Sequence, residues 1–223
     1  MAERLGIQTG EELIAVIDVD ETLYTNPPYT RFRSQQELEE AARILDVDLA
    51  TVTAMITTKH EELRCTLDRE VTRTETVCAL GITSAAWDEV RYRTWQPEQW
   101  LSSDPGLCEA VRTFQLQTGM KVCFATNAPG EKGRKTLQVL GFSEDSFLYF
   151  CPENLGCLKP DFQFFSRIAE KLEVLPIQCL AIGDRQMSDI DPAIAAGFSC
   201  GFVVQGRDDF LGVLSTLTGR RES

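Results

Sequence analysis

The feature that most constrains the fold is a short apolar run that ends in a group of carboxylates. Residues 13–17 read LIAVI, and Asp18, Asp20 and Glu21 follow directly. An apolar run without polar alternation is typical of a parallel strand that is buried on both faces. In open α/β sheets, ligands bind at the carboxyl ends of the strands. We therefore interpret these acids as candidates for chemistry rather than for solubility.

Further apolar runs extend this pattern through the second half of the chain. We expect strands at residues 121–126, 147–151, 178–182 and 198–204, separated by helical stretches. The clearest helix has Asp104 and Pro105 at its start and Gly119 at its end. Strands that alternate with helices predict an α/β fold with a Rossmann-like, doubly wound parallel sheet.

The segment between residues 24 and 104 has no evident strand. Helical patterns cover residues 34–45, 48–67 and 84–93, and a weaker one covers 72–80. This is the content of a small helical bundle inserted after the first strand. We therefore expect a core domain made of residues 1–24 and 104–223, and an inserted helical cap made of residues 25–103.

The composition limits the kinds of partner that the protein can bind. The 223 residues are 43% apolar and carry a formal net charge of −12, which argues against a basic face for polymeric nucleic acid or an anionic membrane. No apolar stretch approaches the roughly 20 residues that span a bilayer. The first residues, MAERLGIQTGEEL, lack the pattern of a signal peptide. We expect a soluble, cytoplasmic protein.

The cysteines indicate a reduced protein. Eight are scattered along the chain, mostly inside apolar runs, and none forms a Cys-x-x-Cys pair. They are typical of reduced core residues rather than of a disulfide framework. Because His60 is the only histidine, a zinc site of the usual Cys/His kind is not expected.

The acidic pair after the first strand has several possible interpretations. Side chains two apart on a strand share a face, so Asp18 and Asp20 are expected on one side. Such a pair can act as an ionised nucleophile or metal ligand and a protonated acid, or it can be a solvated turn. A calcium-binding EF-hand loop is excluded, because Leu23 stands where the turn glycine is required and Tyr29 where the bidentate glutamate belongs.

Polar residues also follow the later strands. Thr126 and Asn127 either form a phosphate cradle with a helix N-terminus or cap that helix. Lys159, with Pro160 at an expected helix start, is either an ammonium that neutralises a phosphate or a carboxylate, or a surface residue.

A last pair of acids, Asp184 and Asp189, follows the strand at 178–182. These acids meet those of the first strand if the two strands are neighbours. An oxygen-only cluster of this kind favours a hard cation, and Mg2+ is the natural choice. Asp191, which precedes Pro192, is assigned to the start of the next helix and not to the site.

Taken in order, the segments VIDVDETL, FATNA, LKPD and IGDRQMSDIDPAIAAG resemble the four motifs of the haloacid dehalogenase-like (HAD) hydrolase superfamily, which often carries a helical cap after the first strand. The resemblance covers nearly all of the chain after the first ten residues. It implies that Asp18 attacks phosphorus to give an aspartyl-phosphate. It also implies that Asp20 protonates the leaving alcohol and later deprotonates water.

The resemblance further implies a Mg2+ site and a phosphate site. The implied metal ligands are Asp18, the backbone carbonyl of Asp20, and Asp184, with Asp189 as a ligand or as a residue that orients one. The implied phosphoryl contacts are Thr126, Asn127 and Lys159, since charge stabilisation is most of the catalytic task.

Within the superfamily that the chain resembles, dehalogenases lack an acid at the position of Asp20 and ATPases carry a threonine, so the resemblance implies a phosphatase or a phosphomutase. Mutase-like relatives usually have glycine where Glu21 stands, which favours hydrolysis. Arg185 occupies a position that often holds a small residue, so its role stays open.

Within the superfamily, DVDETLY, TNA and LKPD look most similar to the pyrimidine 5'-nucleotidase-like branch. A nucleoside 5'-monophosphate is therefore the first substrate hypothesis, with a sugar phosphate or phosphoglycolate as the alternative. A non-catalytic member that binds a phosphorylated ligand or a partner is a further alternative. Several residues are candidates for substrate selection, and each can equally be an ordinary packing or surface residue. They are Tyr24, Tyr29, Arg31, Arg33, Arg91 and Trp95.

Overall fold

A computed structural model describes residues 12–219 of the chain. Residues 1–11 and 220–223 lie outside the described residues, and so does most of the amino-terminal segment for which no signal peptide is expected. Contact clustering divides the chain into two compact units. One contains the residues up to Thr25 and from Leu101 onward, and the other contains Asn26–Trp100.

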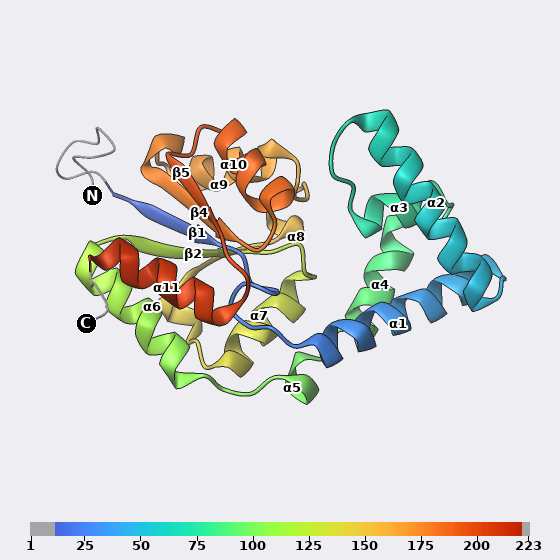
Figure 1. The fold of residues 1–223 in the computed structure, drawn as a ribbon, viewed down its shortest axis with the longest axis horizontal. Coiled ribbons are helices and arrows are strands. Elements are labelled where there is room, and N and C mark those ends of the chain that lie inside the picture. The colour runs from blue at the N-terminus through green and yellow to red at the C-terminus, as the bar shows by residue number, and fades with distance from the viewer. Residues whose placement is uncertain (1–11, 220–223) are drawn as a thin grey trace. The chain divides into compact units, whose positions relative to one another are not determined.

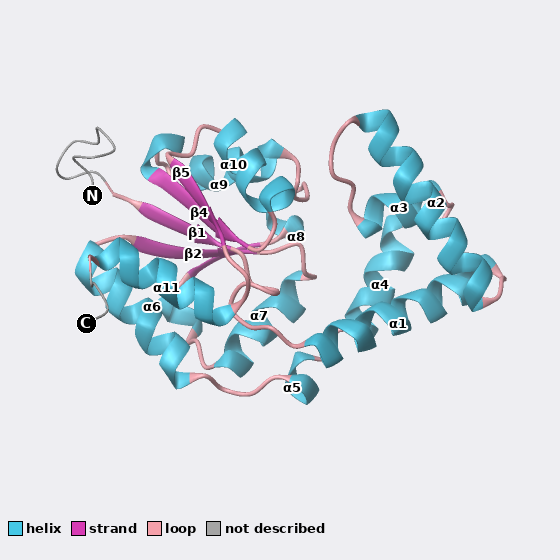
Figure 2. Cartoon of the chain, in the orientation of Figure 1, coloured by secondary structure: helices cyan, strands magenta, loops and turns pink. Residues whose placement is uncertain are grey.

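The first unit is built around a five-stranded parallel sheet with the order β3-β2-β1-β4-β5 (Figures 1 and 2). The strands are β1 (Ile14–Ile17), β2 (Lys121–Ala125), β3 (Leu148–Phe150), β4 (Cys179–Gly183) and β5 (Cys200–Val203). All five expected strands are present, with ends that differ by no more than two residues. The predicted α/β fold class with a doubly wound sheet is confirmed.

Helices cover both faces of this sheet. They are α6 (Pro105–Thr118), α7 (Gly130–Leu140), α8 (Pro152–Leu155), α9 (Phe162–Lys171), α10 (Asp191–Ala195) and α11 (Arg207–Thr218). Helices α9 and α10 pack on one face through a core cluster that contains Val16, Phe164, Ile168 and Ala193. Figure 1 shows α6 and α11 on the opposite face. The sheet is therefore buried on both sides, as its apolar strands require.

Local signals explain where these helices begin and end. The side chain of Asp104 caps α6 by accepting a hydrogen bond from Leu107 N, and Gly119 ends it in the left-handed conformation. The expectation for Pro160 was wrong. Helix α9 begins at Phe162 with Asp161 as its N-cap, and Pro160 lies in the preceding turn.

The second unit is entirely helical within the described residues. It contains α1 (Pro27–Leu45), α2 (Leu49–Leu67), α3 (Arg73–Ala79), α4 (Ser84–Thr94) and the short α5 (Pro97–Trp100). Its apolar core includes Ala41, Val52, Val77 and Trp87. Helix α1 begins seven residues earlier than expected, because Asn26 caps it and two prolines occupy its first turn.

All eight cysteines lie in the described part of the chain and are free thiols. Among the helices of residues 12–219, none has the length and apolar character needed to cross a bilayer.

Candidate active site

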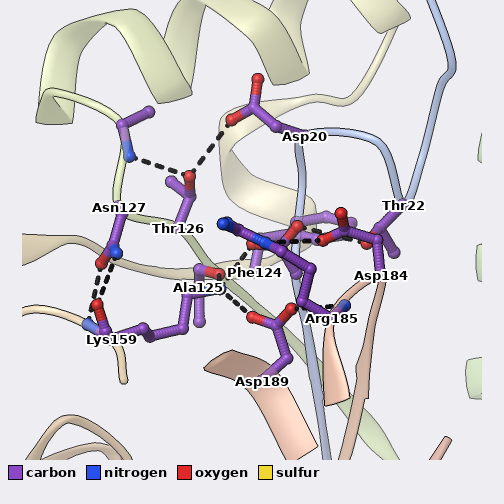
Figure 3. Close-up of polar contacts among 12 residues, drawn as sticks. Asp20, Thr22, Phe124, Ala125, Thr126, Asn127, Lys159, Asp184, Arg185 and Asp189 are labelled. Atoms are coloured by element: carbon purple, nitrogen blue, oxygen red, sulfur yellow. Dashed lines mark hydrogen bonds and ion pairs between the residues drawn. The ribbon is translucent and has the colours of Figure 1, made fainter. Parts of the chain in front are cut away.

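The site lies at the carboxyl ends of the three central strands. Ile17, the last residue of β1, pairs with Phe124 on β2 and with Ile182 on β4. Asp18 comes directly after β1, and the neighbouring strands run into Thr126 and Asp184. The parallel register thus brings together side chains that are more than 50 residues apart in the sequence, and Figure 3 shows Thr126 and Asp184 with their neighbours.

Lys159 is at the centre of the charged groups. Its Nζ lies 2.5 Å from Oδ1 of Asp18 and 2.6 Å from Oδ1 of Asp189, and it also donates to the carbonyl of Ala125 at 3.2 Å. The Lys159 side chain is 2% exposed, so this lysine is not a surface residue. One ammonium thus holds two buried carboxylates.

Burial shifts the pKa values of these groups. Desolvation raises the pKa of Asp18 to about 7, although Lys159 opposes the shift, and the neighbouring carboxylates add to it. For Lys159, burial alone lowers the pKa, but the contacts with Asp18 and Asp189 outweigh it and hold the pKa above its usual value. The ammonium form of Lys159 is therefore favoured.

Three carboxylates form a group that fits a hard cation. One oxygen each of Asp18, Asp184 and Asp189 lies within 4.8 Å of the others. Oδ1 of Asp184 is buried and has no hydrogen-bond partner. Burial also raises the pKa of Asp184 to about 6, despite the opposing effect of Arg185. Carboxylate oxygens, one of them buried without a hydrogen-bond donor, are ligands of the kind that Mg2+ takes.

Asp189 reaches this group from a single turn of π-helix, Gln186–Ile190, that follows β4. Its Oδ2 accepts a hydrogen bond from Arg185 N at 3.0 Å. Gly183 makes the approach possible, because a Cβ there would lie 2.4 Å from the Cβ of Asp189. Gly183 was absent from the predicted site, although its position directly before Asp184 is visible in the sequence.

Hydrogen bonds within the turn after β1 hold Asp18 and Asp20. Thr22 Oγ1 donates to Oδ2 of Asp18 at 3.2 Å, and the Tyr24 hydroxyl donates to Oδ1 of Asp20 at 2.5 Å. Each donor therefore comes four residues after its acceptor. Glu21 allows the tight turn by adopting a left-handed conformation, with φ of 61°. Thr22 was not among the predicted site residues.

The segment after β2 is held by hydrogen bonds of a different kind. Asn127 donates to the Lys159 carbonyl at 2.8 Å and accepts from the Lys159 amide at 2.9 Å. Thr126 Oγ1 accepts from Ala128 N at 3.0 Å and lies 3.4 Å from Oδ2 of Asp20. Helix α7 has no side-chain cap, so the alternative in which these two residues cap that helix is wrong.

Arg185 lies at the edge of the site. Its side chain is mostly exposed, and its Nε is 3.7 Å from Oδ1 of Asp184. This contact adds a cation close to the carboxylate group without occupying its interior.

The comparisons with known proteins agree with this geometry. A family model for haloacid dehalogenase-like hydrolases matches residues 14–197, which include all of the acids described above. No curated protein sequence matches the chain significantly.

Several solved structures share the fold. A HAD phosphatase from Thermococcus onnurineus is 17% identical, covers 95% of this chain and 100% of its own, and has a TM-score of 0.60. A magnesium-bound structure of YfnB, a proposed HAD-hydrolase from Bacillus subtilis, is 16% identical and has a TM-score of 0.56. It covers 92% of this chain and 100% of its own. A predicted phosphoglycolate phosphatase from Haemophilus somnus is 17% identical and has a TM-score of 0.54. It covers 94% of this chain and 99% of its own.

Proposed function

The chain belongs to the haloacid dehalogenase-like hydrolase family, and on that premise we propose that it is a Mg2+-dependent phosphomonoesterase. The observation that carries the proposal is the pairing of Asp18 with Lys159, with a second carboxylate, Asp20, two residues further along the same turn. A nucleophile, a buried cation and a separate acid are the parts that phosphoryl transfer through a covalent intermediate needs. A module that only binds phosphate has no need of two such carboxylates.

In the first step we propose that a carboxylate oxygen of Asp18 attacks phosphorus. A bond forms between that oxygen and phosphorus, and the bond from phosphorus to the substrate oxygen breaks. Asp20 gives its proton to the leaving oxygen, so the product is an alcohol. In the second step Asp20 takes a proton from water, the water oxygen bonds to phosphorus, and the Asp18 carboxylate is released with inorganic phosphate.

Lys159 has two tasks in this scheme. Its ammonium neutralises the buried charge of Asp18 before the reaction and stabilises the phosphoryl oxygens as they approach. When bound, Mg2+ supplies further positive charge to the same oxygens. We assign its ligands to Asp18, Asp184, Asp189 and the backbone carbonyl of Asp20.

We propose different roles for the two polar residues after β2. The hydroxyl of Thr126 lies beside Asp20 and is a candidate for contact with the phosphoryl group. The Asn127 side chain is bonded to both backbone groups of Lys159. We therefore propose that Asn127 acts by positioning Lys159, in addition to any phosphate contact of its own.

For the substrate, we propose a nucleoside 5'-monophosphate, on the similarity of three of the motifs to the pyrimidine 5'-nucleotidase-like branch. Residues 25–103 are proposed as the cap that selects it. Phosphoglycolate is the second candidate, because a fold relative is a predicted phosphoglycolate phosphatase. Within the helical unit, the guanidinium of Arg33 lies 4.6 Å and 4.2 Å from the ring centres of Tyr29 and Trp95, so these candidates also stabilise the unit itself.

The test is phosphate release from uridine 5'-monophosphate, glucose 6-phosphate, 2-phosphoglycolate and p-nitrophenyl phosphate, with Mg2+ and with EDTA. We expect Mg2+-dependent turnover that is lost in Asp18→Asn and kept in Asp145→Asn, an exposed aspartate outside the site. Turnover that persists in Asp18→Asn would contradict the mechanism. No turnover of any substrate by a folded, Mg2+-binding protein would favour a binding role.

A further inference from the structure

Tyr24 makes a contact that the proposed mechanism does not yet use. Its hydroxyl donates to Oδ1 of Asp20 at 2.5 Å. Thr126 Oγ1 donates to the other carboxylate oxygen, Oδ2, over the longer distance of 3.4 Å. The two oxygens of the proposed acid are therefore in different surroundings, and Figure 3 shows Oδ2 turned toward the segment after β2.

The backbone fixes the place of the Tyr24 hydroxyl. Leu23 N donates to the carbonyl of Val19 at 3.0 Å, and a bridge pairs Asp20 with Tyr24. The ring of Tyr24 is buried, with 7% of the residue exposed. A buried ring on a hydrogen-bonded turn has little freedom to rotate away from its acceptor.

A glycine packs closely against the end of the same turn. Gly206, after β5, has a φ of 84°, and a Cβ there would lie 2.1 Å from Thr25 Oγ1. The turn thus approaches the backbone of Gly206 as closely as a residue without a side chain allows. The position of Tyr24 is therefore supported by the fold, and does not depend on the hydroxyl contact alone.

We propose that Tyr24 is a positioning residue that selects which oxygen of Asp20 carries the transferred proton. The phenol O–H of Tyr24 occupies Oδ1 as an acceptor at 2.5 Å, whereas the contact of Thr126 with Oδ2 is long and weak, so the acidic proton is held on Oδ2. From Oδ2 it passes to the leaving oxygen as the phosphorus–oxygen bond breaks, and Oδ2 later accepts a proton from water. Tyr24 keeps its own proton throughout. This inference rests on the proposed phosphatase function.

The leaving group provides a selective test. An alkoxide leaving group needs its proton during bond cleavage, whereas p-nitrophenolate leaves readily without one. The value of kcat/KM reports the steps up to release of the alcohol, so hydrolysis of the intermediate does not affect it. A defect in the orientation of Asp20 must therefore lower kcat/KM for an alkyl phosphate much more than for p-nitrophenyl phosphate.

The experiment compares Tyr24→Phe with the wild type on p-nitrophenyl phosphate and on uridine 5'-monophosphate or 2-phosphoglycolate, whichever alkyl phosphate the wild type hydrolyses faster. We expect kcat/KM for the alkyl phosphate to fall by about 10- to 100-fold, as part of the total effect of a general acid. The loss should be in kcat, with KM little changed. The loss on p-nitrophenyl phosphate should be at least about tenfold smaller. The phenylalanine keeps the buried ring, and thermal unfolding checks that the variant is folded.

A double-mutant cycle completes the test. If Tyr24 acts only through Asp20, Tyr24→Phe causes no further loss of alkyl phosphate turnover in an Asp20→Asn background. Additive losses, equal losses on both substrates, or no loss at all would overturn the inference. These outcomes differ from failure of the proposed function, in which Asp18→Asn would retain turnover of both substrates.

Discussion

The ammonium of Lys159 lies 2.5 Å from Oδ1 of Asp18, and both side chains are almost fully buried. Lys159 also holds Asp189 at 2.6 Å, so removal of this one cation leaves two buried carboxylates without their partner. Pairing of this kind connects stability with activity, because the same charge serves the folded protein and the reacting phosphoryl group.

Lys159→Met should therefore lower both catalytic activity and stability. We expect kcat to fall by at least about 100-fold, since a donor to the transferring group is lost. The free energy of unfolding, measured with urea, should fall by about 3–5 kcal/mol, because two carboxylates stay buried and unpaired. The matched control is Lys135→Met on the exposed face of α7, which should change stability by less than about 0.5 kcal/mol. Equal effects of the two substitutions would contradict this account.

Asp184→Asn should separate metal binding from folding. With wild-type protein, Mg2+ is expected to raise the melting temperature, because a ligand that binds only the folded state stabilises it. The substitution should remove most of that increase. Calorimetry or dye-based melting with a Mg2+ titration measures it, and an unchanged increase would exclude Asp184 as a ligand.

Without Mg2+, the same variant should show a pH-dependent gain in stability. The pKa of Asp184 is raised from 3.8 to about 6 in the folded protein. A raised carboxyl pKa means that wild-type stability falls as pH rises from about 4 through about 6. Asparagine cannot titrate, so the variant should become more stable relative to the wild type as pH rises over that range. A difference in stability that is constant with pH would count against this interpretation.

Gly183→Ala should displace Asp189. The added Cβ would lie 2.4 Å from the Cβ of Asp189, so the π-helical turn has to move. We expect a loss of about 1–3 kcal/mol in the free energy of unfolding, together with lower kcat. Gly212→Ala is the control, since a Cβ within α11 meets nothing within 4 Å and should stabilise the helix by about 0.5–1 kcal/mol. Similar effects at the two sites would show that the contact with Asp189 is unimportant.

Glu173→Gly should stabilise the protein. Glu173 follows α9 with a φ of 55°, in a turn where Val174 N donates to the Ala169 carbonyl and Glu173 N to that of Glu170. The left-handed conformation costs about 1–2 kcal/mol for a residue with a Cβ, and glycine gives back about 0.5–1 kcal/mol in unfolded-state entropy. The net gain should be about 0.5–1 kcal/mol by urea unfolding. Glu173→Ala keeps the Cβ, so a gain of the same size in that variant would show that charge, not conformation, is responsible.

Much of the fold could be predicted, because its determinants are local. The strands read as apolar runs, and the helix α6 has its cap at Asp104 and its stop at Gly119. The early start of α1 was missed, because a Pro-Pro pair after Asn26 is as typical of a loop as of a first helical turn. For the same reason Pro160 was misread as a helix start.

The hydrogen bonds within the site were harder to predict. The contacts of Thr22 with Asp18 and of Tyr24 with Asp20 depend on a left-handed residue at position 21. Glutamate rarely adopts that conformation, so nothing in the residue type indicates the turn. The bonds between Asn127 and Lys159 join segments 32 residues apart, and their geometry depends on the packing of the whole sheet edge.

The most direct test of the central claim is detection of a phosphoryl group on Asp18 during turnover. Wild-type protein is mixed with Mg2+ and its best substrate, quenched in acid, reduced with borohydride and digested for mass spectrometry. We predict homoserine in place of Asp18, formed by reduction of the acyl phosphate, and none without substrate. Phosphate release at the full rate with Asp18 unmodified, or with the label on another residue, would contradict the account.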